Sequence, residues 1–234
     1  MRKILSILLL CALGRAAHAE PRFTVVTVDP AREQIALFLG DEAGVPFQGF
    51  KKLAAWLATR SQAMTFAMNG GMYHADFSPV GLLVQNGKQL APLNLADGKG
   101  NFFLKPNGVF LLAAAGPMVI AASEYPNLKD PAFLATQSGP LLLRHGKIHP
   151  GFNPNSLSRH IRNGVGVLDG KALFVISEEP VTFHEMATFF RDTLKCRDAL
   201  YLDGAVSALH LPSQGRSDNR GVLGPIIAVL GKRE

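Results

Sequence analysis

Short turn sequences that recur between apolar runs are the feature that most constrains the fold of this chain. Asn86-Gly87 lies between the two apolar stretches of VGLLVQNGKQLAPL, and Asp169-Gly170 lies in the same way within GVGVLDGKALFVIS. Such pairs favour the left-handed backbone of tight turns between antiparallel strands. Asn107-Gly108 in FFLKPNGVFLL and His145-Gly146 in GPLLLRHGKIHP predict two further hairpins. A chain with this many hairpins must be rich in β-sheet.

Two segments break the strand pattern and predict helices. From Phe50, the apolar residues Leu53, Ala54 and Leu57 fall on one helical face. In VTFHEMATFFRDTLKC, an N-terminal capping box is formed by Thr182 and Glu185. The same segment carries an apolar stripe, which is typical of core packing: Phe183, Met186, Phe190 and Leu194. We therefore predict an α+β class, a single domain with a long mixed or antiparallel sheet, several hairpins and a few flanking helices.

The first nineteen residues have the layout of a cleavable secretory signal peptide. A basic start, MRK, precedes the apolar stretch Ile4–Leu13, and Ala17-His18-Ala19 supplies a small-x-small cleavage site. The apolar stretch is too short to remain as a membrane anchor. We divide the chain into a signal peptide, residues 1–19, and one domain, residues 20–234. The mature protein is expected to be periplasmic or secreted.

Charge and cysteine content exclude several classes of protein. Arg2, Lys3 and Arg15 lie in the signal peptide, so removing them lowers the formal charge from +6 to +3. No long basic run remains, so we expect no nucleic-acid partner and no membrane span. Cys196 is the one cysteine outside the signal peptide and is expected to be a buried structural thiol. The sequence does not define an oligomeric state.

The stretch TFAMNGGMYHADFSPVG places polar groups directly after a predicted strand. Asn69 carries an amide that can donate and accept, and Gly70-Gly71 leaves the backbone open to close approach by a ligand. Successive N–H groups in such a turn can hold an anion. Tyr73 and His74 are further candidates for substrate binding, and Asp76 is a candidate carboxylate. The simpler interpretation is a tight turn after a strand.

A second candidate region is DALYLDGAVS. Asp203 stands at the end of a predicted buried strand, where a carboxylate is held rigidly and a low dielectric raises its pKa. Gly204 and Ser207 share the same turn. The alternative is that Asp203 only shapes that turn. Glu178, at the end of the strand ALFVIS, is a candidate second carboxylate or a favourable charge before the following helix.

Two further groups of residues could contact a ligand. Arg159 and Arg162 precede a glycine-flanked strand, and guanidinium groups suit phosphate or carboxylate oxygens. Ser138-Gly139 opens the strand of QSGPLLL, where the serine could donate a hydrogen bond to a ligand. The flanking glycines of a nucleophile elbow are absent around that serine. His74 and Asp76 lack the spacing of a metal site, so we expect no metal and no cofactor.

Taken in order, these motifs resemble the phosphodiester glycosidase family. The resemblance is carried by NGGMY…SPVGLLVQNGK, GNFFLKPNGVF, QSGPLLL, RHIRNGVGV and TFHEMATFFRD…ALYLDGAVS, which span Thr65 to Pro212. It implies hydrolysis of a glycosidic bond whose leaving group is a phosphate ester. The implied partner is a small molecule or glycan that contains a phosphodiester.

The resemblance also assigns roles to individual residues. It implies that Asn69, Gly70 and Gly71 contact the phosphate, that Arg162 offsets its charge, and that Ser138-Gly139 forms part of the site. Asp203 would act at the anomeric carbon, with Glu178 or Asp76 as the second carboxylate. The chain departs from the family at Ala205-Val206, where glycines are frequent.

Two alternatives stay open at the level of the sequence. The departure at Ala205-Val206 is compatible with a non-catalytic module that binds envelope glycans or phosphate on the same fold. A serine or cysteine hydrolase would instead use Ser138, Ser207 or Cys196 as its nucleophile.

Overall fold

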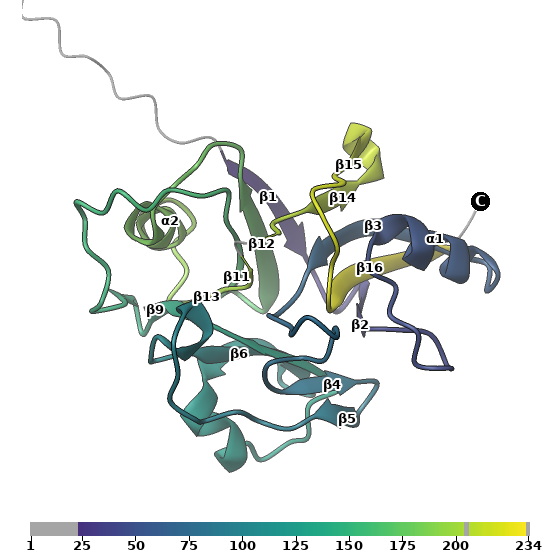
Figure 1. Cartoon of the computed structure of the whole chain (residues 1–234), viewed down its shortest axis with the longest axis horizontal. Helices are drawn as coiled ribbons and strands as arrows, with labels where there is room; N and C mark the ends of the chain where they lie inside the picture. The colour runs from purple at the N-terminus through teal and green to yellow at the C-terminus, as the bar shows by residue number, and fades with distance from the viewer. Residues whose placement is uncertain (1–22, 204–205, 233–234) are drawn as a thin grey trace, which may run out of the picture.

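Three antiparallel sheets that share one apolar core make up the computed structural model, which describes residues 23–203 and 206–232 (Figure 1). The α+β class and the single domain are as predicted. The strands divide among three sheets, where the sequence analysis expected one long sheet. The reason is local: each hairpin fixes only its own pair of strands, and the longer connections decide which pairs adjoin.

The first sheet has the strand order β1-β12-β11-β13-β9-β10. Its strands are β1 (Phe23–Val28), β9 (Leu141–Arg144), β10 (Lys147–Ile148), β11 (Asn163–Leu168), β12 (Lys171–Ser177) and β13 (Asp198–Tyr201). Two predicted hairpins are confirmed here. Asp169-Gly170 joins β11 to β12, and His145-Gly146 joins β9 to β10, with positive φ at all four residues.

The second sheet has the order β15-β14-β3-β16-β2. Its strands are β2 (Gln34–Phe38), β3 (Gln62–Asn69), β14 (Leu209–Leu211), β15 (Arg216–Ser217) and β16 (Ile226–Lys232). The third sheet has the order β5-β4-β8-β6-β7 and consists of β4 (Leu83–Gln85), β5 (Lys88–Ala91), β6 (Gly108–Ala113), β7 (Gly116–Ala121) and β8 (Leu134–Ser138). The predicted hairpin at Asn86-Gly87 is confirmed between β4 and β5.

The predicted hairpin at Asn107-Gly108 is wrong. Gly108 begins β6, whose hairpin partner β7 is reached through the later turn between Ala113 and Gly116. Asn107 is buried, and its amide donates to the Phe102 carbonyl at 3.0 Å. A side chain at Gly108 would overlap Leu141 and the Ile120 carbonyl. Tertiary contacts, and not a turn, therefore explain this Asn-Gly pair.

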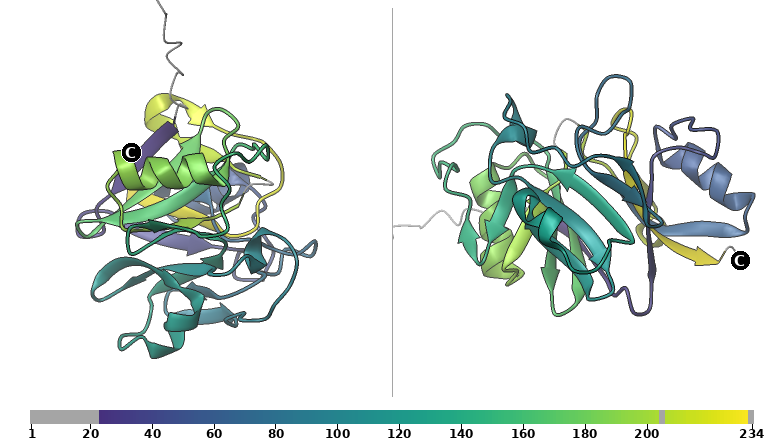
Figure 2. Two further views of the ribbon diagram at one scale, coloured as in Figure 1. Left: turned by 90° about the vertical axis from the view of Figure 1, so that its left-hand side faces the viewer. Right: turned by 90° about the horizontal axis from the view of Figure 1, so that it is seen from below.

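Both predicted helices are present. α1 (Phe50–Ala58) buries Phe50, Leu53 and Leu57 on the second sheet. α2 (Phe183–Thr188) continues as a short π-helical stretch, η3 (Phe189–Thr193), and packs on the first sheet (Figure 2). The capping box is confirmed, since the Glu185 N–H donates to Thr182 Oγ1 at 3.1 Å. Short 3-10 turns complete the fold: η1 (Asn101–Phe103), η2 (Ala122–Asn127) and η4 (Pro212–Gln214).

The main core lies where the three sheets meet. Phe174 of β12 packs against Phe66 of β3, with ring centroids 5.0 Å apart, and against Phe110 of β6 at 5.6 Å. One aromatic ring thus joins all three sheets. Because the sheets converge at this point, strand ends from different sheets lie near one another and can position side chains jointly. Within the described residues, no helix combines the length and apolar character needed to cross a membrane.

Candidate active site

The candidate site is built around two asparagines from different sheets. Asn69 ends β3 and Asn163 begins β11, and both side chains are buried. Their amides pair reciprocally, with Nδ2 to Oδ1 distances of 3.3 Å from Asn69 and 3.1 Å from Asn163. Asn69 Oδ1 also accepts the Ala208 N–H at 2.9 Å. This pair fixes the end of the second sheet against the start of a strand in the first.

Asp203 is positioned by the same pair. It lies two residues beyond the end of β13, and its N–H donates to Asn163 Oδ1 at 3.2 Å. The Ser207 hydroxyl lies 2.6 Å from the Asp203 carbonyl oxygen, the shortest of its three contacts, so we assign its proton to that bond. Gly204 and Ala205 lie outside the described residues. The backbone on both sides of them is therefore fixed by Asn163 and Ser207.

Asp203 lines an open cavity of about 470 Å³. The cavity has aromatic walls and a few polar groups, as binding sites for small molecules commonly have: Tyr73, Phe102, Phe103, His74, Lys99, Asn101 and Asp203. Burial raises the pKa of Tyr73, and the Asp203 charge raises it further. Burial also raises the pKa of Tyr201. The positive charge of Arg162 lowers this pKa in part, and the negative charge of Asp203 raises it. Two phenol groups therefore lie within electrostatic range of the carboxylate.

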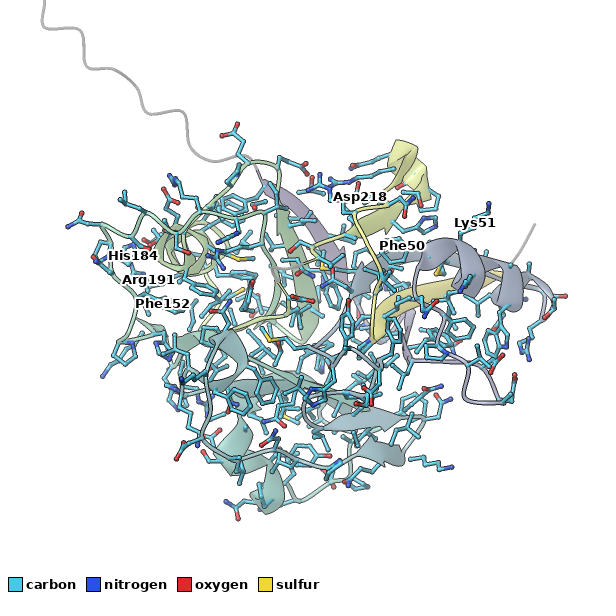
Figure 3. The ribbon with its side chains drawn as sticks, viewed as in Figure 1. Phe50, Lys51, Phe152, His184, Arg191 and Asp218 are labelled. Atoms are coloured by element: carbon cyan, nitrogen blue, oxygen red, sulfur yellow. The ribbon has the colours of Figure 1, made fainter. Side chains whose placement is uncertain are left out.

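A larger cavity, of about 660 Å³, lies between α1 and the segment that follows β15. Phe50 and Lys51 contribute from one side and Asp218 from the other, and Figure 3 shows these three side chains near one another. None of the candidate catalytic or binding residues predicted from the sequence lines this cavity. We therefore place the candidate active site at the smaller cavity, which holds Asp203.

Comparison with known proteins decides the family. A family model described as phosphodiester glycosidase matches residues 62–220, which include the asparagine pair, the cavity and Asp203. The chain is also 36% identical over 203 residues to the Escherichia coli K12 protein YigE, which is named as uncharacterized. That match covers 86% of this chain and 79% of YigE.

The chain belongs to the phosphodiester glycosidase family.

Solved structures agree on the fold. The catalytic domain of zebrafish N-acetylglucosamine-1-phosphodiester alpha-N-acetylglucosaminidase, auto-inhibited by its pro-peptide, has a TM-score of 0.63 at 13% identity. The match covers 92% of this chain and 85% of that one. A Burkholderia pseudomallei protein has a TM-score of 0.56 at 12% identity, over 88% of this chain and 73% of its own. At these identities the likeness concerns the fold alone.

In this member of the family, the two adjacent glycines are required by packing. The Gly70 N–H donates to the Pro225 carbonyl at 2.7 Å, and the Gly71 N–H donates to Thr136 Oγ1 at 3.1 Å. A Cβ at Gly71 would lie 2.3 Å from the Gln137 carbonyl oxygen. The prediction that these N–H groups are open to a phosphate is therefore contradicted. Because Gly71 has no side chain, the chain that follows β3 can pass close to Thr136 and Gln137 of β8.

Ser138 and Gly139 also support the site from within the protein. Ser138 is fully buried, and its hydroxyl donates to the Leu202 carbonyl, one residue before Asp203. A Cβ at Gly139 would lie 2.6 Å from the Phe102 carbonyl oxygen. Instead of donating to a ligand, as predicted, Ser138 holds the strand that presents the carboxylate.

Arg162 is not exposed to the cavity. Its side chain is 1% exposed, and its guanidinium lies 3.8 Å above the Phe183 ring centroid. Its nitrogens donate to the Val181 carbonyl at 2.9 Å, the Ser158 carbonyl at 3.2 Å and the Tyr201 hydroxyl at 3.4 Å. Burial lowers the pKa of Arg162. The predicted role as a direct phosphate ligand is not supported by this geometry, because the group already holds the segment before β11 onto α2.

Glu178 belongs to a charge cluster away from the Asp203 cavity. Arg216 Nη1 lies 2.6 Å from Glu178 Oε1 and Arg216 Nη2 lies 2.9 Å from Asp218 Oδ2, and Thr24 donates to Glu178. Burial alone would raise the pKa of Glu178, but the hydrogen bonds from Thr24 and Arg216 lower it below its usual value. Glu178 does not line the cavity. Its contacts tie β12 to β15.

Asp76 and Arg159 lie at the surface. Asp76 accepts from the Ser78 N–H and hydroxyl, which lower its pKa, and it does not line the cavity beside its neighbour His74. Arg159 forms an ion pair with Glu185, at 2.6 Å from Nη2 to Oε1. Neither residue is brought to Asp203.

The remaining candidate nucleophiles are held inside the protein. Burial raises the pKa of the Cys196 thiol to about 11, as expected for a structural cysteine. The Ser207 and Ser138 hydroxyls both donate to backbone carbonyls. Within the described residues, no three of the His, Cys, Asp and Glu side chains are grouped so that they could hold a metal ion.

Three polar residues of the site were not predicted from the sequence. Asn163 was not among the candidates, although it follows Arg162 directly and begins β11. Lys99 and Asn101 lie in a glycine-containing loop, LADGKGN, that carries no periodic signal. The one hint in the sequence was the position of this polar loop, which lies between the segment of Asn69 and the segment of Ser138, both of which were already candidates.

Proposed function

We propose that this protein is an exported hydrolase that cleaves the glycosidic bond of a sugar phosphodiester. The observation that carries the proposal is the placement of Asp203, which lines an aromatic-walled cavity in a chain of the phosphodiester glycosidase family. Support for its export comes from the layout of residues 1–19. The zebrafish enzyme of similar fold acts, by its name, on an N-acetylglucosamine-1-phosphodiester.

The chemistry follows from the group that leaves. The bond between the anomeric carbon and the phosphate oxygen breaks, and its electron pair departs with a phosphate monoester. A carboxylate at the anomeric carbon can attack directly or activate the water that replaces the leaving group. A phosphate monoester needs little protonation to leave, so one well-placed carboxylate suffices for the hardest step. Asp203 has the rigid backbone that such a role requires, through Asn163 and Ser207.

The proposal is tested with purified mature protein and a panel of sugar 1-phosphodiesters. Hydrolysis should release the free sugar, and Asp203→Asn should lower kcat by roughly 1,000-fold or more, since a carboxylate at the reacting carbon contributes orders of magnitude. Asp76→Asn is the matched control, because its carboxylate is exposed and does not line the cavity.

That control should retain activity within about threefold. A loss of only a few-fold in Asp203→Asn would remove Asp203 from catalysis. Binding of intact phosphodiesters without turnover would instead favour the non-catalytic glycan-binding module.

A further inference from the structure

A phosphodiester substrate brings a negative charge into a cavity that already contains a carboxylate. Asp203 and a phosphate repel each other, and the phosphate gains a second negative charge as the glycosidic bond breaks. A cation placed in the cavity would offset both effects, and would do so most strongly in the transition state. Arg162, the predicted source of that charge, is buried against Phe183 and bonded to backbone carbonyls. Another side chain must supply it.

Lys99 is the cationic side chain that the geometry offers. It lines the same cavity as Asp203. Among the described residues it forms no hydrogen bond and no ion pair, in contrast with Lys105 nearby. Lys105 lies 2.6 Å from Asp97 Oδ1 and donates to the Leu95 carbonyl at 2.8 Å. The Lys99 ammonium is thus available to an anion, whereas that of Lys105 is already neutralised.

The loop around Lys99 is anchored and carries a second polar group. A Cβ at Gly98 would lie 2.7 Å from the Phe103 ring, so the backbone before Lys99 packs closely on a cavity wall. Asn101 also lines the cavity, and its side-chain amide has no partner among the described residues. His74 also lines the cavity, on the side of Asp76, whose pKa is lowered by hydrogen bonds from Ser78 and, to a smaller extent, by His74.

We propose that Lys99, with Asn101, forms the phosphate subsite of this cavity. This inference rests on the proposed function and adds the group that recognises the anion. The ammonium binds a non-bridging phosphate oxygen as a point charge, and the Asn101 amide donates to another. As the bond from the anomeric carbon to oxygen breaks, the pair of electrons goes to the phosphate monoester beside Lys99. Water supplies the hydroxyl that ends on the sugar and the proton that balances the reaction.

The first test measures binding without turnover. Inorganic phosphate and glycerol 3-phosphate are titrated into ¹⁵N-labelled mature protein, and amide shifts of Gly100 and Asn101 are followed. Lys99→Gln should weaken binding by about tenfold, a modest value for an exposed charged hydrogen bond, and Lys99→Arg should retain most of it. Lys88→Gln is the matched control, since Lys88 is an exposed lysine on β5 that does not line the cavity.

The second test uses kinetics. With a phosphodiester substrate, Lys99→Gln should lower kcat/KM by about tenfold or more and flatten its dependence on salt, since salt screens an exposed charge. With an uncharged aryl glycoside of the same sugar, the variant should match the wild type, which a general structural defect would not allow.

The outcomes separate this inference from the proposed function. Equal phosphate binding by wild type and Lys99→Gln, or shifts confined to residues outside the cavity, would overturn the phosphate subsite while leaving hydrolysis by Asp203 intact. Phosphate binding that depends on Lys99 in a protein that hydrolyses no phosphodiester would uphold the subsite and reject the hydrolase.

Discussion

At the scale of single residues, the site depends on buried amides more than on charges. Asn163 contacts Asn69, the Asp203 N–H and the Ser207 hydroxyl, so one side chain links a strand of the second sheet to the loop that carries the carboxylate. Each of these partners is buried. A buried polar group that loses its partner costs far more than an exposed one. Under the proposed function, Asn163 is therefore a positioning residue that acts on catalysis through Asp203.

Asn163→Ala should lower the free energy of unfolding by about 2–4 kcal/mol, because several buried groups lose their hydrogen bonds together. Urea denaturation measures this loss. In the folded fraction, kcat should fall at least about tenfold with little change in KM, since the carboxylate is no longer held in place. Asn155→Ala, in an exposed loop, is the control and should stay within about 0.5 kcal/mol of the wild type.

A second substitution separates positioning from stability. Asn163→Asp keeps an acceptor for the Asp203 N–H but adds a carboxylate beside Asp203. Like charges raise one of the two pKa values, so the acidic limb of the pH–rate profile should move to higher pH. An unchanged profile would show that Asn163 does not act through Asp203.

At the scale of elements, the end of β3 is set by its contact with β8. The two glycines after Asn69 looked like an open turn in the sequence, yet their N–H groups bond to Pro225 and Thr136. The missing side chain at Gly71 is what allows the chain to pass so near the Gln137 carbonyl. The hairpins, in contrast, have the backbone that their sequences indicate, because a two-residue turn depends on its own φ angles.

Gly71→Ala should lower the free energy of unfolding by about 3 kcal/mol, because backbone atoms of β8 must move to admit a methyl group. Thermal and urea denaturation measure the change. Gly49→Ala serves as the control. It precedes α1 with no atom within 4 Å of the added Cβ, and its cost should stay within about 1 kcal/mol. Equal effects of the two substitutions would contradict the packing explanation.

At the scale of the whole molecule, an ion cluster joins two of the sheets. Arg216 of β15 contacts Glu178, which follows β12, and Asp218 beyond β15. Burial would raise the pKa of Asp218, but the hydrogen bonds from Arg216 and the Leu209 N–H lower it, and Glu178 behaves likewise. A carboxyl with a lowered pKa stabilises the fold above its unfolded pKa and loses that contribution as pH falls through its folded value.

The stability supplied by this cluster should therefore be present at pH 7. It should decline below the ordinary values of 4.5 for Glu178 and 3.8 for Asp218. Urea denaturation is measured at pH 7, 5, 4 and 3. The urea midpoint of Arg216→Gln should lie well below that of the wild type at pH 7 and close to it at pH 3. Arg60→Gln breaks an exposed pair with Glu42 and should have little effect throughout. A gap for Arg216→Gln that does not change with pH would refute the cluster's role.

The sequence by itself determined the features that depend only on residues close to one another in the chain. It gave three of the four proposed hairpins, both helices, the capping box at Thr182 and the α+β class. These structures are set by local φ angles, caps and apolar periodicity. It also pointed to Asp203, because a polar residue after a buried strand is a local pattern.

Only the tertiary structure decided which side chains meet. Arg162 and Ser138 were chosen for their chemistry, yet the packing of three sheets buries both and leaves Lys99 in the cavity that Asp203 lines. Asn69 and Asn163 are 94 residues apart in the chain, with the whole third sheet between them, and they touch only because the first and second sheets converge. Such contacts arise from long-range strand order, which no short stretch of sequence encodes.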